Sequence, residues 1–372
     1  MSLIIYILKY PFSGGAETRF WEIHKRLAGR FDIHLITSSL GKKDDEVIDG
    51  ISVHCIPTLW SSCINVKVNF YARPAHFYMK LPHRLRKLAA DAAIVNDDMS
   101  PVPTFPGLFL KRDVATILHF HEIGGETNLK LFGAFGIPIW LSEKMMSIIR
   151  YDEYVASIPE AGRVLKRKYG IGSQVVPGGV DTKVFMPGRN VGGDLNILNI
   201  GRMTPQKNQI DFLRLARRIL DEEKRVRFTI IGTGPLEKYL KEKAAELGIS
   251  KRVTFLKNLH IRDYVKAIQG CDICVITENV QAGFGIVNVE ALSCGKPLVA
   301  YDIPGRADVV SPESGFLVRP NDFEALAQKT LMLVDDAHLR SRIGLAARSH
   351  VTRNFDYDVI AKKMGKIYEK YL

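Results

Sequence analysis

The sequence predicts an α/β protein with two tandem domains, each built on a doubly wound parallel sheet, and a ligand cleft between them. Short apolar runs rich in β-branched residues alternate with helical patterns along the whole chain. This alternation is typical of parallel sheets that are covered by helices on both faces. A chain of 372 residues is also long for a single core and natural for two domains.

The first half of the chain alternates strand and helix patterns up to a linker. Strands are expected at residues 3–8, 33–37, 51–56, 92–96, 114–120 and 154–157, and helices at 17–28, 75–90 and 160–169. Residues 177–190 are rich in Gly, Pro and Asp, which indicates a linker. The first domain is therefore expected at residues 1–182.

The alternation restarts in the second half, and the second domain is expected at residues 190–355. Strands are expected at residues 196–200, 226–231, 253–255, 273–277 and 297–301, and helices at 208–220, 236–247, 261–268, 286–293 and from 322 onward. In doubly wound domains, ligands bind at the carboxyl ends of the strands.

The bulk composition is that of an ordinary globular protein, with 46% hydrophobic and 25% charged residues. No apolar run approaches the roughly 20 residues that span a bilayer. The first twelve residues read as a buried strand and not as a signal peptide, so we expect a cytoplasmic protein. Cys271 and Cys274 form a C-x-x-C inside an apolar strand pattern, where buried strand cysteines are favoured over a metal or redox site.

The net charge of +12 divides into +5 for residues 1–185 (23 basic, 18 acidic) and +7 for residues 186–372 (29 basic, 22 acidic). Such dispersion argues against a nucleic-acid-binding stripe and favours anionic partners such as nucleotide diphosphates or an acidic membrane surface. The basic helical pattern with Lys80, Arg84, Arg86 and Lys87 has two interpretations, a solvated helix face or a membrane contact. The apolar residues 124–140 suit a mobile loop over an acceptor or a buried crossover.

The segment 277–300 carries the most information. It reads as a strand end, a glycine-rich turn Gly283-Phe284-Gly285, and a helix that starts at Ile286 and carries Glu290. Such a turn directs backbone N–H groups and a helix N-terminus at one point, which suits a phosphate. Further along the helix, the carboxylate of Glu290 is placed to accept hydrogen bonds from ribose hydroxyls.

Other strand ends carry further candidates. Gly14-Gly15 follows the first strand, where backbone can approach a ligand. Gly201 precedes Arg202, and Lys207 lies just before a helix; the two cations are interpreted as a clamp on a diphosphate, in preference to two solvated surface cations. The turn that contains Gly234 is equally well read as a nucleotide loop or as a plain structural turn.

Histidines and acids also close strands in the first half. His119 and His121 end one strand and alternate onto the same face. We interpret His119 as a core residue and His121 as a site residue. Asp97 and Asp98 follow Asn96 at another strand end, where a turn and helix cap is favoured over metal chemistry.

In this order along nearly the whole chain, these motifs resemble the retaining glycosyltransferases of family 4, also called glycosyl transferases group 1. The resemblance also includes the Pro-x-Gly-Val-Asp stretch at residues 177–181. In that family a glutamate precedes Gly-Phe-Gly, and a second glutamate follows after seven intervening residues. Glu290 is the second of these, whereas Ala282 occupies the position of the first.

The resemblance implies a GT-B fold of two Rossmann-like domains, with the C-terminal helix at residues 356–372 packing back on the first domain. It implies transfer with retention from a nucleotide-diphosphate sugar to a glycan, lipid-linked or small-molecule acceptor, without a metal or cofactor. Arg202, Lys207 and His121 would be the catalytic residues. The donor-binding residues would be Gly14, Gly15, Gly201, Gly234, Gly283, Phe284, Gly285, Ile286 and Glu290.

Ala282 leaves alternatives open, because its side chain cannot form the sugar hydrogen bonds of the family's glutamate. Gln281 or Glu278 is a candidate for a replacement contact. An enzyme with altered donor selection, a non-catalytic protein that binds a nucleotide sugar, and a GT-B nucleotide-sugar epimerase all remain compatible with the sequence. A nucleic-acid binder is disfavoured, because the chain shows no recognition module.

Overall fold

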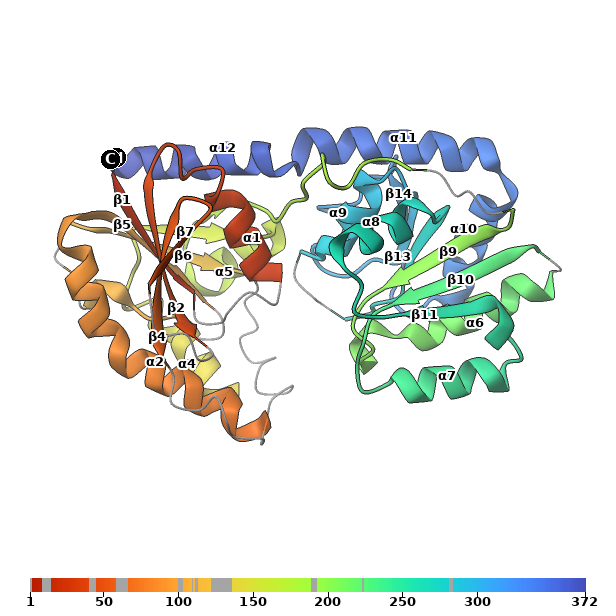
Figure 1. Cartoon of the computed structure of the whole chain (residues 1–372), viewed down its shortest axis with the longest axis horizontal. Helices are drawn as coiled ribbons and strands as arrows, with labels where there is room; N and C mark the ends of the chain where they lie inside the picture. The colour runs from red at the N-terminus through yellow and green to blue at the C-terminus, as the bar shows by residue number, and fades with distance from the viewer. Residues whose placement is uncertain are drawn as a thin grey trace. The chain divides into compact units, whose positions relative to one another are not determined.

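The computed structural model describes residues 2–8, 15–39, 45–57, 66–99, 103–108, 110, 113–121, 136–188, 193–222, 224–280 and 284–372. The chain forms two compact units (Figure 1). The first comprises Met1–Gly178 and Tyr357–Leu372, and the second comprises Gly179–Asp356. Residues 179–182 and Asp356 thus belong to the second unit, whereas the sequence placed them with the first.

The sheet of the first unit has eight strands in the order β3-β4-β2-β1-β5-β6-β7-β8. The strands are β1 (Leu3–Leu8), β2 (Asp32–Ser39), β3 (Glu46–Ile48), β4 (Ile51–Pro57), β5 (Ala92–Asp98), β6 (Ala115–Phe120), β7 (Glu153–Ala156) and β8 (Gln174–Val175). All neighbours pair in parallel except β3, which is antiparallel to β4. The two short edge strands β3 and β8 were not predicted, because two or three residues carry no readable periodicity.

Helices cover both faces of this sheet. They are α1 (Gly15–His24), α2 (Val66–Leu88), α4 (Gly136–Met145), α5 (Pro159–Tyr169) and α12 (Tyr357–Tyr368), with 3₁₀ turns η1 (Ala89–Asp91), η2 (Pro106–Leu108) and η6 (Glu369–Tyr371). One apolar cluster packs α1 and α12 against one face, and a second packs α2 against the other. The C-terminal helix is tied to α1 by a 2.7 Å hydrogen bond between His24 Nε2 and Tyr368 Oη and by a 2.6 Å ion pair between Arg26 and Asp358.

The sheet of the second unit has six parallel strands in the order β11-β10-β9-β12-β13-β14. They are β9 (Leu195–Ile200), β10 (Val226–Ile231), β11 (Val253–Leu256), β12 (Ile273–Ile276), β13 (Leu298–Tyr301) and β14 (Gly315–Val318), the last of which was not predicted. Counted within the unit this is the order 3-2-1-4-5-6 of a Rossmann fold, which reverses between β9 and β12. The prediction of two doubly wound parallel-sheet domains is therefore confirmed.

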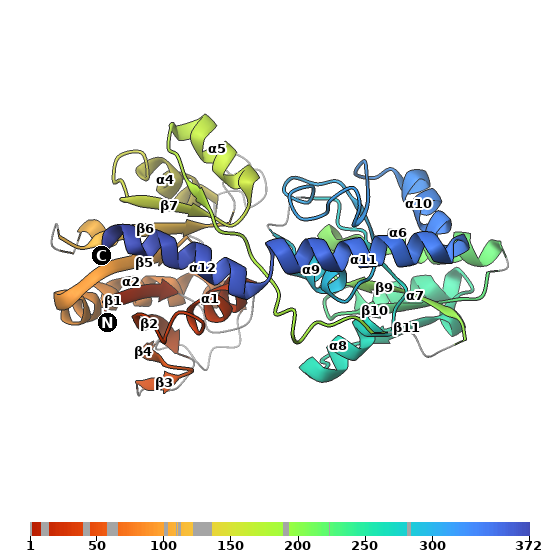
Figure 2. The ribbon, with the colours of Figure 1, turned by 90° about the horizontal axis from the view of Figure 1, so that it is seen from above.

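The helices of the second unit lie on both sides of its sheet (Figure 2). They are α6 (Gln209–Asp221), α7 (Glu237–Glu246), α8 (Ile261–Gln269), α9 (Ile286–Ser293), α10 (Phe323–Asp335) and α11 (Ala337–Asn354), with 3₁₀ turns η4 (Pro205–Lys207) and η5 (Ser250–Arg252). All four residues of β12 are buried, as expected for a central parallel strand.

The cysteines of the C-x-x-C motif are buried at and beside β12, and no disulfide joins them. Burial raises the pKa of Cys271 to about 12, so its thiol stays protonated. The described residues include no cluster of His, Cys, Asp or Glu that could hold a metal ion. Within the same residues, no helix is both long and apolar enough to cross a membrane.

Helix α11 approaches α9 closely through a glycine. A Cβ built on Gly344 would lie 2.3 Å from the carbonyl oxygen of Gly295, closer than real Cβ contacts. We therefore expect Gly344→Ala to push the two segments apart and to lower the free energy of unfolding by about 1–3 kcal/mol. Chemical denaturation checks this, with Gly193→Ala as the control because a Cβ there would meet nothing within 4 Å. Equal midpoints for the two variants would contradict the expected clash.

Candidate functional site

The candidate site of the second unit lies where the strand order reverses, at the carboxyl ends of β9 and β12. Gly201 and Arg202 follow β9, and Lys207 ends the short turn η4 before α6. Thr277 and Glu278 follow β12. A topological switch point of this kind is the usual ligand site of doubly wound sheets. Gly201, Arg202 and Lys207 thus lie at the strand end where the sequence placed them, and their role in binding stays a prediction.

Buried polar side chains fix the Lys207 loop to β12. The Asn199 amide donates to the carbonyl of Val275 at 2.8 Å and to the Thr277 hydroxyl at 3.3 Å. That hydroxyl donates in turn to the backbone carbonyl of Lys207 at 2.9 Å. On the other side, the Gln209 amide donates to the carbonyl of Arg202 at 3.1 Å. The loop that carries both cations is thus held at its two ends.

Lys207 is bound to a buried carboxylate. Its ammonium donates to Glu278 Oε1, and Arg306 donates from Nη2 to the other oxygen, Oε2, at 3.0 Å. Glu278 and Arg306 are each only 3% exposed. The second guanidinium nitrogen, Nη1, donates to the carbonyl of Tyr301 at 2.6 Å. Sequence reasoning missed Arg306, because no local pattern joins the loop after β13 to the end of β12.

The three charges leave an excess of one positive charge at the switch point. Burial lowers the pKa of Arg306 from its usual value, and the neighbouring Glu278 carboxylate opposes that effect. The Lys207 side chain is 26% exposed and so reaches solvent, whereas Arg306 does not. An anion that arrives at this edge would meet the Lys207 ammonium, with Arg306 offsetting the charge of Glu278.

Arg202 is not brought against Lys207. Its side chain is exposed and makes no ion pair or hydrogen bond with any residue in the described part of the chain. Gly201 is close to Lys207 instead, since a Cβ on this glycine would lie 3.4 Å from Lys207 Cδ. The two cations therefore flank one loop, as predicted, while the clamp between them stays a prediction.

The proposed substitution of Glu278 for the missing signature carboxylate has no support in the structure. Both carboxylate oxygens already accept hydrogen bonds, from Lys207 and Arg306, and the side chain is buried. Glu278 therefore serves to hold the two cations. Gln281, Ala282 and Gly283 lie outside the described residues.

The turn before α9 is shaped by Gly285, whose φ of +67° is in the left-handed region that favours glycine. A Cβ there would lie 2.5 Å from the side-chain amide nitrogen of Asn288. The ring of Phe284 is buried and packs against Phe355, with ring centroids 5.7 Å apart. Helix α9 begins at Ile286, and no side chain of the described residues caps it. Uncapped N–H groups at a helix N-terminus are compatible with an anion site.

Glu290 lies on α9 and faces Tyr264 of α8, which sequence reasoning did not single out. The Tyr264 hydroxyl donates to Glu290 Oε2 at 2.6 Å. Burial raises the pKa of Glu290 to about 7, and this hydrogen bond opposes the rise. One carboxylate oxygen of this half-buried side chain is thus held by Tyr264, and the other accepts no hydrogen bond from any residue in the described part of the chain.

The glycines at residues 232 and 234 allow two backbone segments to touch. A Cβ on Gly232 would lie 2.0 Å from the carbonyl oxygen of Gly201, and one on Gly234 would lie 2.4 Å from that of Met203. The amide of Met203 also donates to Thr233 at 2.8 Å. These contacts support the structural-turn interpretation of Gly234 and tie it to the Arg202 loop. Its contact with a nucleotide stays a prediction.

In the first unit, His121 follows β6 and is held by a buried acid. Its Nε2 lies 3.3 Å from Asp98 Oδ2, which also accepts a hydrogen bond from the Tyr6 hydroxyl at 3.2 Å. The side chain of His121 is 24% exposed, so it reaches solvent at the carboxyl edge of the sheet. Gly15 begins α1, and Gly14 lies outside the described residues. The sugar contact of His121 stays a prediction.

His119 belongs to the core, as predicted. It is 1% exposed, its Nε2 pairs with Asn96 Oδ1 at 2.9 Å, and burial holds its pKa well below the usual value. The helix-cap interpretation of Asp97 and Asp98 is wrong, because β5 extends through both residues and buries them. Asp97 Oδ2 accepts hydrogen bonds from the backbone amide of Thr104 and from the Tyr151 hydroxyl, each at 2.6 Å.

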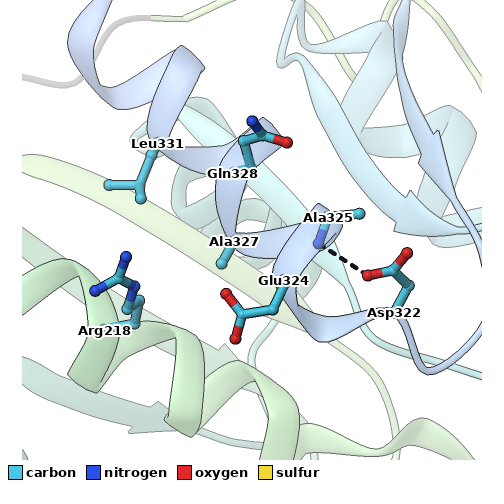
Figure 3. Close-up of a pocket in the computed structure, with 7 residues that line it drawn as sticks. All are labelled: Arg218, Asp322, Glu324, Ala325, Ala327, Gln328 and Leu331. Atoms are coloured by element: carbon cyan, nitrogen blue, oxygen red, sulfur yellow. Dashed lines mark hydrogen bonds between the residues drawn. The ribbon is translucent and has the colours of Figure 1, made fainter.

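A separate hollow of about 530 Å³ lies between α6 and α10 (Figure 3). Its lining combines charged and small side chains: Arg218, Asp322, Glu324, Ala325, Ala327, Gln328 and Leu331. Asp322 caps α10 by accepting from the Ala325 amide at 3.0 Å. The hollow lies on helices that cover the sheet and includes none of the candidate site residues, so we do not assign it a role in the site.

Comparison with known proteins agrees with this geometry. The family model of glycosyl transferases group 1 matches residues 183–350, and that of glycosyltransferase family 4 matches residues 13–184. The two tandem Rossmann units define the GT-B class of fold. The chain belongs to the glycosyltransferase family that these two models describe.

Relatives and solved structures support the same class. A mannosyltransferase from Corynebacterium glutamicum, named as GDP-mannose-dependent and acting on a monoacylated phosphatidylinositol monomannoside, is 25% identical over 52% of this chain and 55% of its own. A D-inositol 3-phosphate glycosyltransferase from Stackebrandtia nassauensis is 34% identical over 48% of this chain and 44% of its own. The matched region thus spans about half the length of these curated relatives.

Two solved structures match the full chain in fold. Sucrose-phosphate synthase from Thermosynechococcus elongatus has a TM-score of 0.83 at 18% identity and covers 100% of this chain and 99% of its own. HepE of Anabaena, solved in complex with UDP-glucose, has a TM-score of 0.76 at 16% identity, with 100% of both chains covered. At these identities the likeness concerns the fold.

Removal of Arg306 should leave the buried Glu278 carboxylate without its buried cationic partner. We expect Arg306→Met to lower the free energy of unfolding by roughly 3–5 kcal/mol, because Glu278 then keeps only the partly exposed Lys207 as a partner. Adding Glu278→Gln in the same chain should recover part of that loss. A double-mutant cycle by chemical denaturation measures the coupling. Strictly additive effects would show that Glu278 and Arg306 do not stabilise each other.

The raised pKa of Glu290 should make stability depend on pH. Its folded-state pKa of about 7 exceeds the ordinary 4.5, so the protonated form stabilises the fold. This contribution is complete below about pH 4.5 and is lost as the pH rises through about 7. The difference in unfolding free energy between wild type and Glu290→Gln should therefore fall over that range. Tyr264→Phe should move the range upward, and parallel pH profiles for wild type and Glu290→Gln would refute the assignment.

Proposed function

We propose that this protein is a retaining glycosyltransferase that moves a sugar from a nucleotide-diphosphate sugar to a glycan, lipid-linked or small-molecule acceptor. The observation that carries the proposal is the solvent-reaching Lys207 ammonium at the switch point of a Rossmann sheet, backed by the buried Glu278–Arg306 pair. The uncapped N-terminus of α9 and the half-buried Glu290 lie on the same unit.

In the proposed reaction, the bond between the anomeric carbon and the diphosphate breaks, and the acceptor oxygen bonds to that carbon on the same face. The acceptor's proton passes to the leaving phosphate. Charge develops on the diphosphate as it departs, and Lys207, Arg202 and the N–H groups at the start of α9 would stabilise it. We propose that no metal takes part, because these groups supply the positive charge. His121 would contact the sugar and Glu290 the ribose.

The nature of the donor and acceptor is proposed from relatives. HepE was solved with UDP and with UDP-glucose, and the Corynebacterium relative is named as dependent on GDP-mannose, so UDP and GDP sugars are the first donors to test. The same relative's name includes a lipid-linked acceptor, and the Stackebrandtia relative's name includes an inositol phosphate. Both acceptor classes belong in the first screen.

A second candidate is a nucleotide-sugar-binding protein without transferase activity. Ala282 motivates it, and the hydrogen bonds of the buried Glu278 to Lys207 and Arg306 disfavour this carboxylate as the missing sugar contact. Loss of one hydrogen bond to a charged group costs about 1.5–3 kcal/mol, which slows a transferase without abolishing leaving-group stabilisation. Tight donor binding with neither transfer nor hydrolysis across the acceptor panel would favour this candidate.

Turnover should depend on Lys207 and Arg202, the two cations of the loop at the switch point. With a donor and acceptor chosen by thermal-shift and product screens, we expect Lys207→Ala and Arg202→Ala each to lower kcat/KM by roughly 10²–10³-fold, as loss of a group that stabilises developing charge does elsewhere. Arg218→Ala on α6 is the matched control, because this cation lies in the hollow away from the switch point. Full turnover by both site variants would exclude the diphosphate clamp.

A further inference from the structure

Helix α4 exposes apolar side chains and buries polar ones, which is the reverse of an ordinary surface helix. Its outward side carries Ile137, Leu141 and Met145, continued by Ile148 in the following turn, and these side chains are 40–81% exposed. The inward side carries Ser142 and Glu143, at 4% and 1% exposed. An exposed apolar stripe along a helix marks a surface that meets another apolar phase.

The inward polar residues of α4 are satisfied, so the reversed orientation is compatible with a stable fold. The Ser142 hydroxyl donates to the carbonyl of Ile139 at 2.7 Å. The Tyr169 hydroxyl of α5 donates to Glu143 at 3.5 Å. The buried Met146 anchors the same side. The apolar stripe therefore faces outward because the polar side of the helix has partners inside the unit.

Helix α2 presents a basic surface on the same face of the sheet. Both the β4–β5 connection through α2 and the β6–β7 connection through α4 advance in the same direction along the sheet, so right-handed crossovers place the two helices on one face. Figure 1 shows them below the strands of the first unit, with α12 above. The buried side of α2 carries Phe77, Leu81 and Leu85, which turns Met79, Lys80, Arg86 and Lys87 outward.

The charges on these two helices are almost all positive. Residues 77–88 contain no acid, and residues 137–150 contain only the buried Glu143. Lys80, Arg86 and Lys87 form no ion pair with any residue in the described part of the chain. Arg84 differs, because it pairs with Asp45. At the edge of the apolar stripe, the Lys144 ammonium lies 4.0 Å from the centroid of the Trp140 ring.

We propose that α4 and the outer side of α2 form a docking face for an anionic lipid bilayer. The apolar stripe of α4 would enter the boundary between headgroups and acyl chains, and the cations of α2 would lie at the level of the anionic headgroups. Long cationic side chains beside an aromatic ring suit this boundary, because their stems are apolar and their ends remain hydrated. A bilayer fits better than a protein partner, because Lys80, Arg86 and Lys87 form no ion pair among the described residues and the one acid within residues 77–88 and 137–150, Glu143, is buried. The proposal goes beyond the transferase activity and does not rest on it.

Vesicle co-sedimentation tests the docking face. The full chain is mixed with phosphatidylcholine vesicles that contain or lack phosphatidylglycerol, at low and high salt. We expect binding to the anionic vesicles that weakens with salt. Arg86→Gln with Lys87→Gln should weaken this binding by roughly fivefold for each charge removed. Leu141→Ser with Ile148→Ser should weaken it by roughly tenfold or more and should also reduce the binding that persists at high salt.

Matched controls separate the docking face from general surface properties. Lys362→Gln with Lys363→Gln removes two exposed cations from α12, on the opposite face of the same sheet. Leu345→Ser removes an apolar side chain that is 72% exposed on α11 of the second unit. Both controls should bind vesicles like the wild type, and thermal midpoints verify that every variant is folded.

Three outcomes would overturn the proposal. The first is that the wild type does not bind anionic vesicles. The second is that the control variants lose as much binding as the α2 and α4 variants do. The third is that Leu141→Ser with Ile148→Ser changes the molar mass measured by light scattering but leaves vesicle binding intact. That result would show that the apolar stripe is an interface between copies of this chain. Nucleotide-sugar binding by the same variants, measured by thermal shift, reports separately on the proposed function.

Discussion

The net positive charge at the candidate site of the second unit depends on the contacts that the buried Glu278 carboxylate makes with Lys207 and Arg306. This carboxylate stands between two cations, with Arg306 locked to backbone on the buried side and Lys207 reaching solvent on the other. A single carboxylate in this position would neutralise Lys207. Because Arg306 supplies a second positive charge in a place that no ligand can reach, the edge of the sheet keeps a net attraction for anions while the lysine is held in place.

This arrangement changes the meaning of Ala282. In the family that the sequence resembles, a glutamate at that position contacts the transferred sugar, and Gln281 and Glu278 were the two candidates for a replacement contact. In the structure Glu278 accepts hydrogen bonds from Lys207 and Arg306 instead, which disfavours it as a replacement contact to the sugar in the proposed reaction. Selection among donor sugars would then fall to other groups such as His121, whereas Glu290, which Tyr264 holds in position, is the proposed ribose contact.

The first unit also has a buried acid that holds a candidate site residue in place. Asp98 joins Tyr6 of β1 to His121 at the end of β6, so a buried acid again holds a side chain that reaches solvent. The opposite faces of its sheet have separate tasks. One receives the C-terminal helix through the His24–Tyr368 hydrogen bond, and the other carries the basic and apolar outer sides of α2 and α4.

The sequence by itself determined the fold class and the positions of most strands and helices, because periodic burial and sharp turns are local properties of the chain. It placed Gly201 and Lys207 together for the same reason, because both lie in the loop that follows β9, and it placed Glu290 on the helix after β12. Three results needed the tertiary structure: the role of Glu278, the contribution of Arg306 and the partner of Glu290. Each depends on buried contacts between residues of separate loops or helices, where desolvation and hydrogen bonding set the charge of the side chains. No local sequence pattern predicts such contacts.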